Sequence, residues 1–137
     1  MLSLAVLPAA GCLSAHQTAV VDVDPRGWTQ EAQVRFANAD TLGRRDLWLV
    51  VRYDGGFAGG ELDLEVTTTA PDSLRFTEPF TLRFAPSHAP SPLLRDTAVL
   101  YRRGVVLRCA GDYTLAIRPR ETVRGVEAVG INIVTSN

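Results

Sequence analysis

Apolar and polar residues alternate at every second position over most of the chain. This period is typical of β-strands with one face against a core and the other in water. In the clearest segments the apolar members are Ala32, Val34 and Phe36; Leu62, Leu64 and Val66; Phe80, Leu82 and Phe84; and Tyr113, Leu115 and Ile117. A weaker alternation at 129–133 predicts a last strand. Each set predicts one core-facing side of a strand.

The segment 47–51 is apolar at every position, which predicts a central strand. Glycine, proline and aspartate clusters between the segments are turn signals at 54–56, 59–60, 70–73 and 111–112. The proline-rich residues 86–92 predict a loop from one sheet to the other. Apolar residues recur at helical spacing over 93–101, so a short helix or an irregular crossover is an alternative for this segment. The pattern as a whole predicts an all-β fold, an antiparallel β-sandwich of seven to nine strands with little helix.

Gly111-Asp112-Tyr113 enters one of these strands. A Gly-x-Tyr at this position resembles the tyrosine corner of Greek-key sandwiches, in which the phenol bonds back to a nearby backbone group. The alternative is a core tyrosine after a turn glycine. Both interpretations favour a sandwich.

Composition narrows the function classes. The 137 residues suit one domain, and 46% hydrophobic with 21% charged residues indicate a globular chain. The 14 basic residues, all arginine, are balanced to a net charge of −1, which argues against nucleic-acid binding and against a polybasic membrane patch. With two cysteines, zinc clusters and multi-disulfide frameworks are excluded by count.

The first twelve residues predict a secretory signal. Their apolar run is shorter than the roughly 20 residues of a transmembrane helix, and Ala9-Ala10-Gly11-Cys12 looks like a bacterial lipobox. We expect a signal peptide at 1–11, a lipidated tether at 12–18 and a single sandwich domain at 19–137. Cys12 would carry two or three acyl chains such as palmitate, placing the chain on the periplasmic side of a membrane. The alternative is a buried N-terminal strand with an incidental cysteine.

Catalytic and cofactor motifs are absent from the sequence. It contains no nucleophile elbow, phosphate loop, zincin motif or EF-hand loop, so we expect no enzyme, no cofactor, no bound metal and no small-molecule substrate. Cys109 is in phase with neighbouring apolar residues and predicts a small core residue, because His88 in a proline-rich coil is a poor catalytic partner. Asp22, Asp24 and Asp112 are an alternative calcium set at one end of a sandwich.

Read together, these segments resemble the gliding-motility lipoprotein GldH family over roughly residues 20–134. The resemblance rests on a series of short matches in order: Gly27-Trp28, Val34-Arg35-Phe36, Asp40, Leu47-Trp48-Leu49-Val50-Val51-Arg52, Phe57, Leu62-Asp63-Leu64, Gly111-Asp112-Tyr113, Gly125 and Ala128-Val129-Gly130-Ile131. The Gly-x-Trp-x-Gly stretch of many members is missing around 86–100, and their Met-Arg pair is replaced near 118–120. The resemblance implies a periplasmic β-sandwich lipoprotein that serves motility and type IX secretion without catalysis.

A protein without a catalytic set is expected to act by contact. The candidate partner surface is Arg52, Tyr53 and Phe57 around a glycine turn, because arginine and aromatic side chains are enriched among interface anchors. The expected partners are the membrane, through the lipid on Cys12, and envelope motility or secretion proteins. The alternative is a carbohydrate- or ligand-binding sandwich in which Trp28, Tyr53 and Phe57 stack on sugars; core packing is the other use of these rings.

Overall fold

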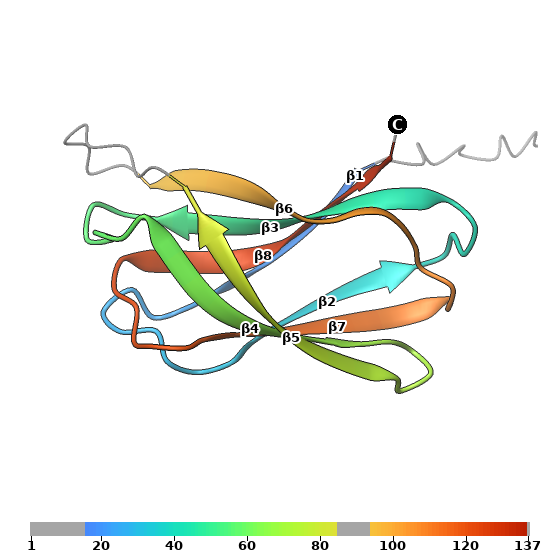
Figure 1. Cartoon of the computed structure of the whole chain (residues 1–137), viewed down its shortest axis with the longest axis horizontal. Coiled ribbons are helices and arrows are strands. Elements are labelled where there is room, and N and C mark those ends of the chain that lie inside the picture. The colour runs from blue at the N-terminus through green and yellow to red at the C-terminus, as the bar shows by residue number, and fades with distance from the viewer. Residues whose placement is uncertain (1–15, 85–93, 137) are drawn as a thin grey trace, which may run out of the picture.

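The computed structural model describes residues 16–84 and 94–136, which form eight strands and no helix (Figure 1). The strands are β1 His16–Asp22, β2 Ala32–Asn38, β3 Arg44–Tyr53, β4 Glu61–Thr69, β5 Arg75–Arg83, β6 Arg95–Val106, β7 Gly111–Pro119 and β8 Val126–Thr135. The predicted all-β class and strand number are confirmed. The predicted signal peptide, Cys12 and the whole proline-rich segment 86–92 with His88 lie outside the described residues.

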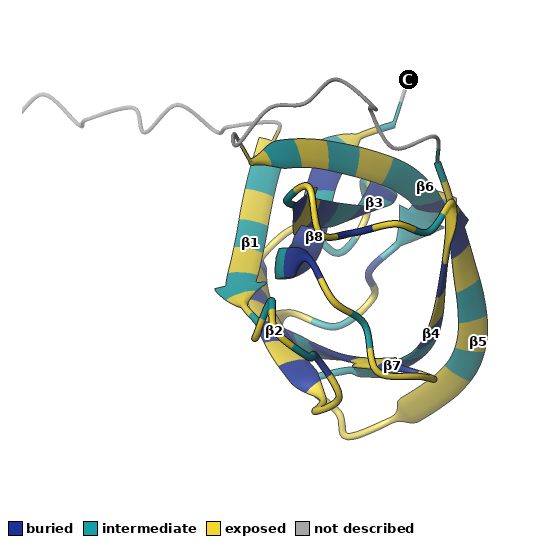
Figure 2. Ribbon diagram, turned by 90° about the vertical axis from the view of Figure 1, so that its left-hand side faces the viewer, coloured by how far each residue is buried: buried dark blue, intermediate teal, exposed yellow. Residues whose placement is uncertain are grey.

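The strands pack as two four-stranded antiparallel sheets in a sandwich (Figures 1 and 2). One sheet has the order β1-β8-β3-β6 and the other the order β2-β7-β4-β5. In the first sheet β3 lies between β8 and β6, which confirms the central strand predicted from 47–51. The chain changes sheet between β5 and β6, as the connection at 86–92 predicted.

The core lies between the sheets and consists of the alternating residues of both. Figure 2 shows the buried positions on the inner sides of the strands. The largest fully buried side chains are Val34, Leu49, Val51, Leu62, Leu64, Val66, Leu82, Leu115, Ile117, Val126, Val129 and Ile131. The alternation predicted for β2, β4, β7 and β8 is therefore confirmed, because it places the apolar side of each strand against the opposite sheet.

The predicted tyrosine corner is present. The phenol oxygen of Tyr113 accepts a hydrogen bond from the backbone N–H of Cys109 at 3.2 Å, and the Tyr113 ring stacks on Phe36 with centroids 5.3 Å apart. The side-chain amide of Asn38 donates to the carbonyls of Leu107 and Cys109 at 2.9 and 2.8 Å. These bonds satisfy polar backbone groups where β6 turns into β7. Cys109 itself is a partly buried free thiol packed against the core, in line with its predicted role.

Two boundaries differ from the sequence predictions. Residues 16–18, expected in the tether, begin β1 and pair with residues 132–134 of β8. Residues 95–101, where a helix or crossover was left open, belong to the long strand β6 paired with β3. In both places backbone pairing with a distant strand determines the structure, and a local pattern carries no record of that pairing.

Candidate functional site

The outer face of the β1-β8-β3-β6 sheet carries apolar side chains on all four strands, interrupted on the β1 side by Thr18 and Asn132. Cross-strand rows on this face run Val20–Gly130–Val50–Ala98 and Thr18–Asn132–Trp48–Leu100. We call the following set the apolar face: Val20, Trp48, Val50, Ala98, Leu100 and Val134. Val20 is 42% exposed and the others are exposed or partly buried. These side chains belong to a sheet face that no other described layer covers.

Polar groups frame the apolar face. At one end Arg52 forms an ion pair with Asp96, with Nε and Oδ1 2.9 Å apart. On the β1 side the hydroxyl of Thr18 donates to the side-chain oxygen of Asn132 at 3.1 Å. A shallow pocket of about 250 Å³ on this face is lined by Thr18, Val50, Asp96, Thr97, Ala98 and Asn132. The face thus combines an apolar centre with a polar rim, which is the anatomy of a protein interface.

The outer face of the other sheet is polar throughout its middle. We call the following cross-strand pairs the charged face: Glu61 with Arg83, Asp63 with Thr81, Glu65 with Arg118, and Thr67 with Thr77. The two ion pairs have N–O distances of 3.2 and 2.9 Å, and the two hydroxyl hydrogen bonds measure 2.6 and 2.9 Å. Each polar side chain has a partner on the neighbouring strand and also reaches water. These four pairs therefore satisfy one another across the strands.

The structure separates the three residues predicted to form one contact surface. Arg52 is exposed at the end of the apolar face, whereas Tyr53 and Phe57 are buried at 7% and 8% exposure. Tyr53 and Phe57 both pack on Phe84, with centroid distances of 5.3 and 5.4 Å. Since neighbouring residues of a strand point to opposite faces, Arg52 and Tyr53 cannot share a surface. Trp28, at 2% exposure, is likewise a core residue and presents no ring for sugar stacking.

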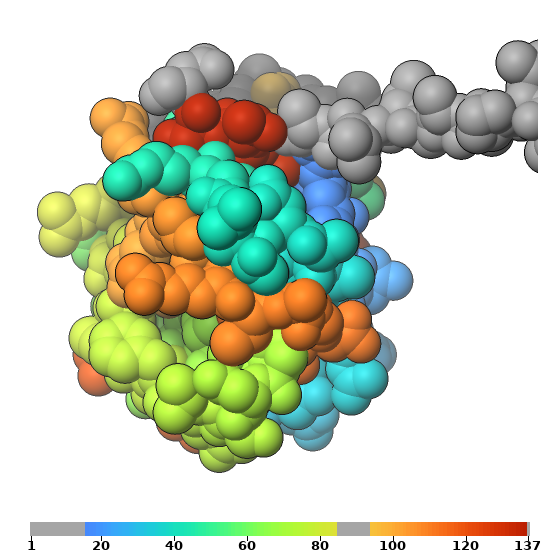
Figure 3. All heavy atoms as spheres, turned by 90° about the vertical axis from the view of Figure 1, so that its right-hand side faces the viewer, coloured from blue at the N-terminus to red at the C-terminus, as the bar shows by residue number. Residues whose placement is uncertain are grey.

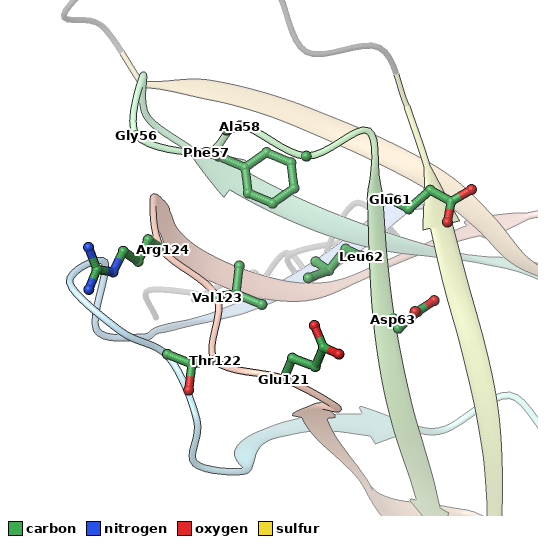
Figure 4. A pocket seen from close by; sticks show the side chains of 11 residues that line it. Gly56, Phe57, Ala58, Glu61, Leu62, Asp63, Glu121, Thr122, Val123 and Arg124 are labelled. Atoms are coloured by element: carbon green, nitrogen blue, oxygen red, sulfur yellow. The ribbon is translucent and has the colours of Figure 1, made fainter.

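A larger pocket of about 710 Å³ opens at the end of the sandwich where β3 turns into β4 (Figure 4). Phe57, Leu62 and Val123 provide its apolar lining. The carboxylate of Glu121 points into the opening, whereas those of Glu61 and Asp63 point toward β5. This end therefore presents an apolar floor with one convergent carboxylate, a composition suited to holding a small ligand.

Gly125 joins three loops at this end. Its carbonyl accepts a hydrogen bond from the N–H of Asp54 at 2.8 Å, and its N–H donates to the carbonyl of Pro25 at 2.8 Å. Its φ of +83° suits glycine, and a Cβ here would lie 2.2 Å from the backbone nitrogen of Phe57. Only glycine therefore allows the segment after β7 to approach the β3–β4 turn this closely.

The residues considered for calcium do not come together. Asp22 ends β1 and Asp24 follows it, and both line a pocket with Ala32 at the beginning of β2, whereas Asp112 pairs with Ala37 near the end of β2. Within 16–84 and 94–136 no group of three or more histidine, cysteine or acidic side chains is arranged to hold a metal ion. The calcium alternative is therefore wrong for this set of residues.

A polar cluster that the sequence did not reveal links the edges of the two sheets. Glu78 of β5 accepts hydrogen bonds from the Tyr101 hydroxyl and the Arg102 guanidinium of β6. Burial opposes ionisation of Glu78, but these two donors outweigh it and lower the pKa of its carboxyl group. Burial and the hydrogen bond to Glu78 raise the pKa of Tyr101. Phe80 packs edge-on against the Tyr101 ring at 5.1 Å, so the cluster holds β5 against β6.

The signal for the apolar face was present in the sequence, in the segment 47–51 that is apolar at every position. Its odd-numbered residues enter the core, and its even-numbered residues Trp48 and Val50 belong to the outer face. The signal for Glu78 was absent, because its partners are more than 20 residues away and in the other sheet.

None of the described residues forms a helix long and apolar enough to cross a membrane.

Comparison with known proteins assigns no family. No family model matches the chain, and no curated protein matches it. Seven chains of solved structures match. One, from the infectious bursal disease virus VP2 subviral particle, is 12% identical with a TM-score of 0.42, and the match covers 90% of this chain and 33% of that one. Another, from carbohydrate-binding modules of the β-sandwich superfamily, is 8% identical with a TM-score of 0.33, over 89% of this chain and 53% of that one.

The chain therefore spans about a third of the viral protein chain and about half of the carbohydrate-binding chain. At TM-scores of 0.42 and 0.33 both similarities are distant, and they assign no function to it.

Proposed function

We propose that this chain is a lipid-anchored β-sandwich of the cell envelope, of the gliding-motility GldH type, which binds another envelope protein through its apolar face and performs no catalysis. The observation that carries the proposal is the contrast between the apolar face and the charged face. Soluble domains rarely leave a contiguous apolar patch uncovered, and such patches mark interaction sites. The expected partner presents a complementary apolar surface with a polar rim.

Arg52 belongs to the rim of this interface. Its side chain is 44% exposed and its partner Asp96 is 57% exposed, so the guanidinium remains available to a partner carboxylate. A rim charge contributes to partner choice and association rate more than to affinity. The anchoring energy is expected from Trp48 and Val50 at the centre of the face.

A substitution on each face tests the contact. Val50→Glu places a charge in the centre of the apolar face, and Thr67→Glu is the matched control on the charged face. With tagged full-length protein in native membranes, Val50→Glu should lower recovery of a specific partner by at least about tenfold, because a desolvated charge is costly in an apolar interface. Thr67→Glu should recover it as the parent does. Equal recovery by both variants contradicts the proposal.

The lipid anchor is supported by Ala9-Ala10-Gly11-Cys12. Two or three acyl chains on Cys12 would hold the protein on a membrane, since stable attachment requires more than one chain. Cys12→Ser should release the protein into the soluble periplasmic fraction. Unchanged fractionation of this variant contradicts the anchor and leaves the contact proposal to its own test.

A second candidate function is binding of a carbohydrate or another small ligand at the pocket beside Phe57 and Glu121. The pocket volume of about 710 Å³ and its apolar floor favour it. Binding on a glycan array that is abolished by Glu121→Ala supports this function. Absence of any glycan signal, or a signal unchanged by the substitution, counts against it.

A further inference from the structure

Figure 3 is a view onto the end of the sandwich at which β1 begins. The β2–β3, β4–β5 and β6–β7 connections reach this end. The first residue of β1 pairs with Val134, and Ser136 donates a backbone hydrogen bond to the carbonyl of Arg44 at 3.0 Å. Both ends of the described chain therefore lie beside these loops. We call this the anchor-side end.

Three large apolar side chains project at the anchor-side end. Leu42, in the β2–β3 connection, is 87% exposed; Leu74, at the tip of the β4–β5 hairpin, is 71% exposed; and Phe76 next to it is 60% exposed. Phe76 has the inward-facing parity of β5 but lies beyond the cover of the other sheet. Exposed apolar side chains on separate loops at one end of a domain are suited to the interfacial layer of a bilayer, where each tip enters separately.

Exposed arginines outnumber exposed aspartates at the anchor-side end, with Arg44, Arg75, Arg103 and Arg108 against Asp40, Asp72 and Asp112. Arg75, Arg103 and Arg108 are exposed and form no ion pair within the described parts of the chain. The carboxylates of Asp40 and Asp72 are instead turned back on their own loops: Asp40 accepts from the N–H groups of residues 42 and 43 at 2.9 Å, and Asp72 accepts from residue 74 at 3.1 Å. The arginines are thus free to meet lipid phosphates.

We propose that the anchor-side end lies on the membrane surface, with Leu42, Leu74 and Phe76 in the interfacial layer and Arg75, Arg103 and Arg108 on anionic phospholipid headgroups. This inference rests on the proposed anchor at Cys12. Four peptide steps separate Cys12 from His16, so the Cα atom of Cys12, to which the lipid would be attached through the side chain, is at most about 14 Å from the Cα atom of His16. A tether of this length brings this end, and not the opposite one, to the bilayer.

The orientation has a functional consequence. The strands run between the anchor-side end and the pocket end (Figure 1), so the apolar face would stand roughly upright on the membrane. A neighbouring protein anchored in or standing on the same membrane would then meet the apolar face from the side. The pocket at the far end would point away from the bilayer.

Tryptophan quenching in vesicles tests the orientation on the full acylated chain. Leu42→Trp introduces a probe at the anchor-side end. Leu94→Trp is the control, because Leu94 is 50% exposed and precedes the residue that pairs with Tyr53 at the opposite end. In phosphatidylethanolamine–phosphatidylglycerol vesicles with brominated acyl chains, the added fluorescence at position 42 should fall at least twofold, and that at position 94 should not change. Equal quenching at both positions, or none at position 42, overturns the proposal.

Mass spectrometry of the N-terminal peptide shows whether Cys12 is acylated. It therefore distinguishes failure of the proposed orientation from failure of the proposed anchor. An acylated Cys12 with an unquenched probe at position 42 rejects the orientation and leaves the anchor standing. An unmodified Cys12 rejects the anchor, and flotation of that chain with the same vesicles then decides the membrane contact. The contact is supported if the chain floats with the vesicles and Leu42→Glu weakens this flotation more than Leu94→Glu does. It is overturned if the chain does not float, or if the two substitutions weaken flotation equally.

Discussion

The two outer faces of this sandwich are built from the same number of antiparallel strands and differ in what they present to water. The charged face matches each carboxylate or hydroxyl with a partner on the next strand, as in Glu65 with Arg118. The apolar face places Trp48 and Val50 at the corresponding central positions of β3. An antiparallel sheet needs one apolar face for the core, and its other face can be polar. The sheet that carries the charged face follows that rule. The apolar face exceeds this requirement, and this excess is the reason for which we propose a partner.

The centre of each face offers the most severe test of this comparison. Gly130 lies in the middle of the apolar face, where a Cβ would be 2.1 Å from the carbonyl oxygen of Ala19 on β1. Ala116 occupies the middle of the charged face and tolerates its Cβ. Gly130→Ala should lower the free energy of unfolding by about 3 kcal/mol by forcing β1 from β8. Ala116→Gly should cost less than about 1 kcal/mol. Denaturant unfolding measures both, and equal effects contradict the close approach of β1.

A second contrast compares a half-buried ion pair with an exposed one. Glu78 is 19% exposed and receives two hydrogen bonds, whereas Glu65 on the charged face is 37% exposed and receives one from Arg118. Glu78→Gln should lower the free energy of unfolding by about 2 kcal/mol. Glu65→Gln should lower it by about 0.3 kcal/mol. Similar costs in denaturant unfolding would show that the β5–β6 cluster adds nothing beyond a surface pair.

The same cluster predicts a pH dependence. Folding lowers the pKa of Glu78 below its ordinary value of 4.5, so the folded chain binds this proton less tightly than the unfolded chain does. The resulting stability is present above pH 4.5 and is lost as the pH falls through the lowered pKa. The difference in unfolding free energy between parent and Glu78→Gln should therefore hold from pH 7 to about 4.5 and shrink at lower pH. A difference that grows on acidification contradicts this account.

Removal of the Arg52 charge at the rim of the apolar face is expected to weaken partner binding without changing stability. Arg52→Ala should leave the melting temperature unchanged, because the pair with Asp96 is exposed. It should weaken partner binding by about three- to tenfold, less than Val50→Glu does. Pull-down from native membranes together with thermal melting measures both quantities. Recovery of every partner at the parental level rejects a role for Arg52.

The smallest effect concerns an acidic corner next to the apolar face. A hydrogen bond with Asp54, together with burial and the nearby charges of Asp54 and Asp22, raises the pKa of Glu127 above its ordinary 4.5. The ionised carboxylate therefore disfavours folding at neutral pH, and this effect vanishes below pH 4.5. Glu127→Gln should raise the melting temperature slightly at pH 7 and leave it unchanged at pH 3.5. A lower melting temperature at pH 7 would contradict the repulsion.

Features of the fold that depend on a local residue pattern were predicted from the sequence. Features that depend on pairing with a distant strand were not. Alternation in β2, β4 and β7 identified their core-facing sides, and Gly111 with Tyr113 identified the corner, because each signal is contained within a few residues. The extent of β1 and β6 depends on hydrogen bonds to β8 and β3, which no local pattern records. For the candidate site, Arg52 was placed correctly on the wet side, but its aromatic companions belong to the core.

Site-specific photo-crosslinking in native membranes tests the central claim most directly. A photoreactive amino acid is placed at Val50 on the apolar face and, in a parallel chain, at Thr67 on the charged face. The account predicts one discrete crosslinked species from position 50 that is absent from position 67 and disappears when Trp48→Ser is added. The same species from both positions, or crosslinks from position 67 alone, would contradict the assignment of the apolar face as the partner surface.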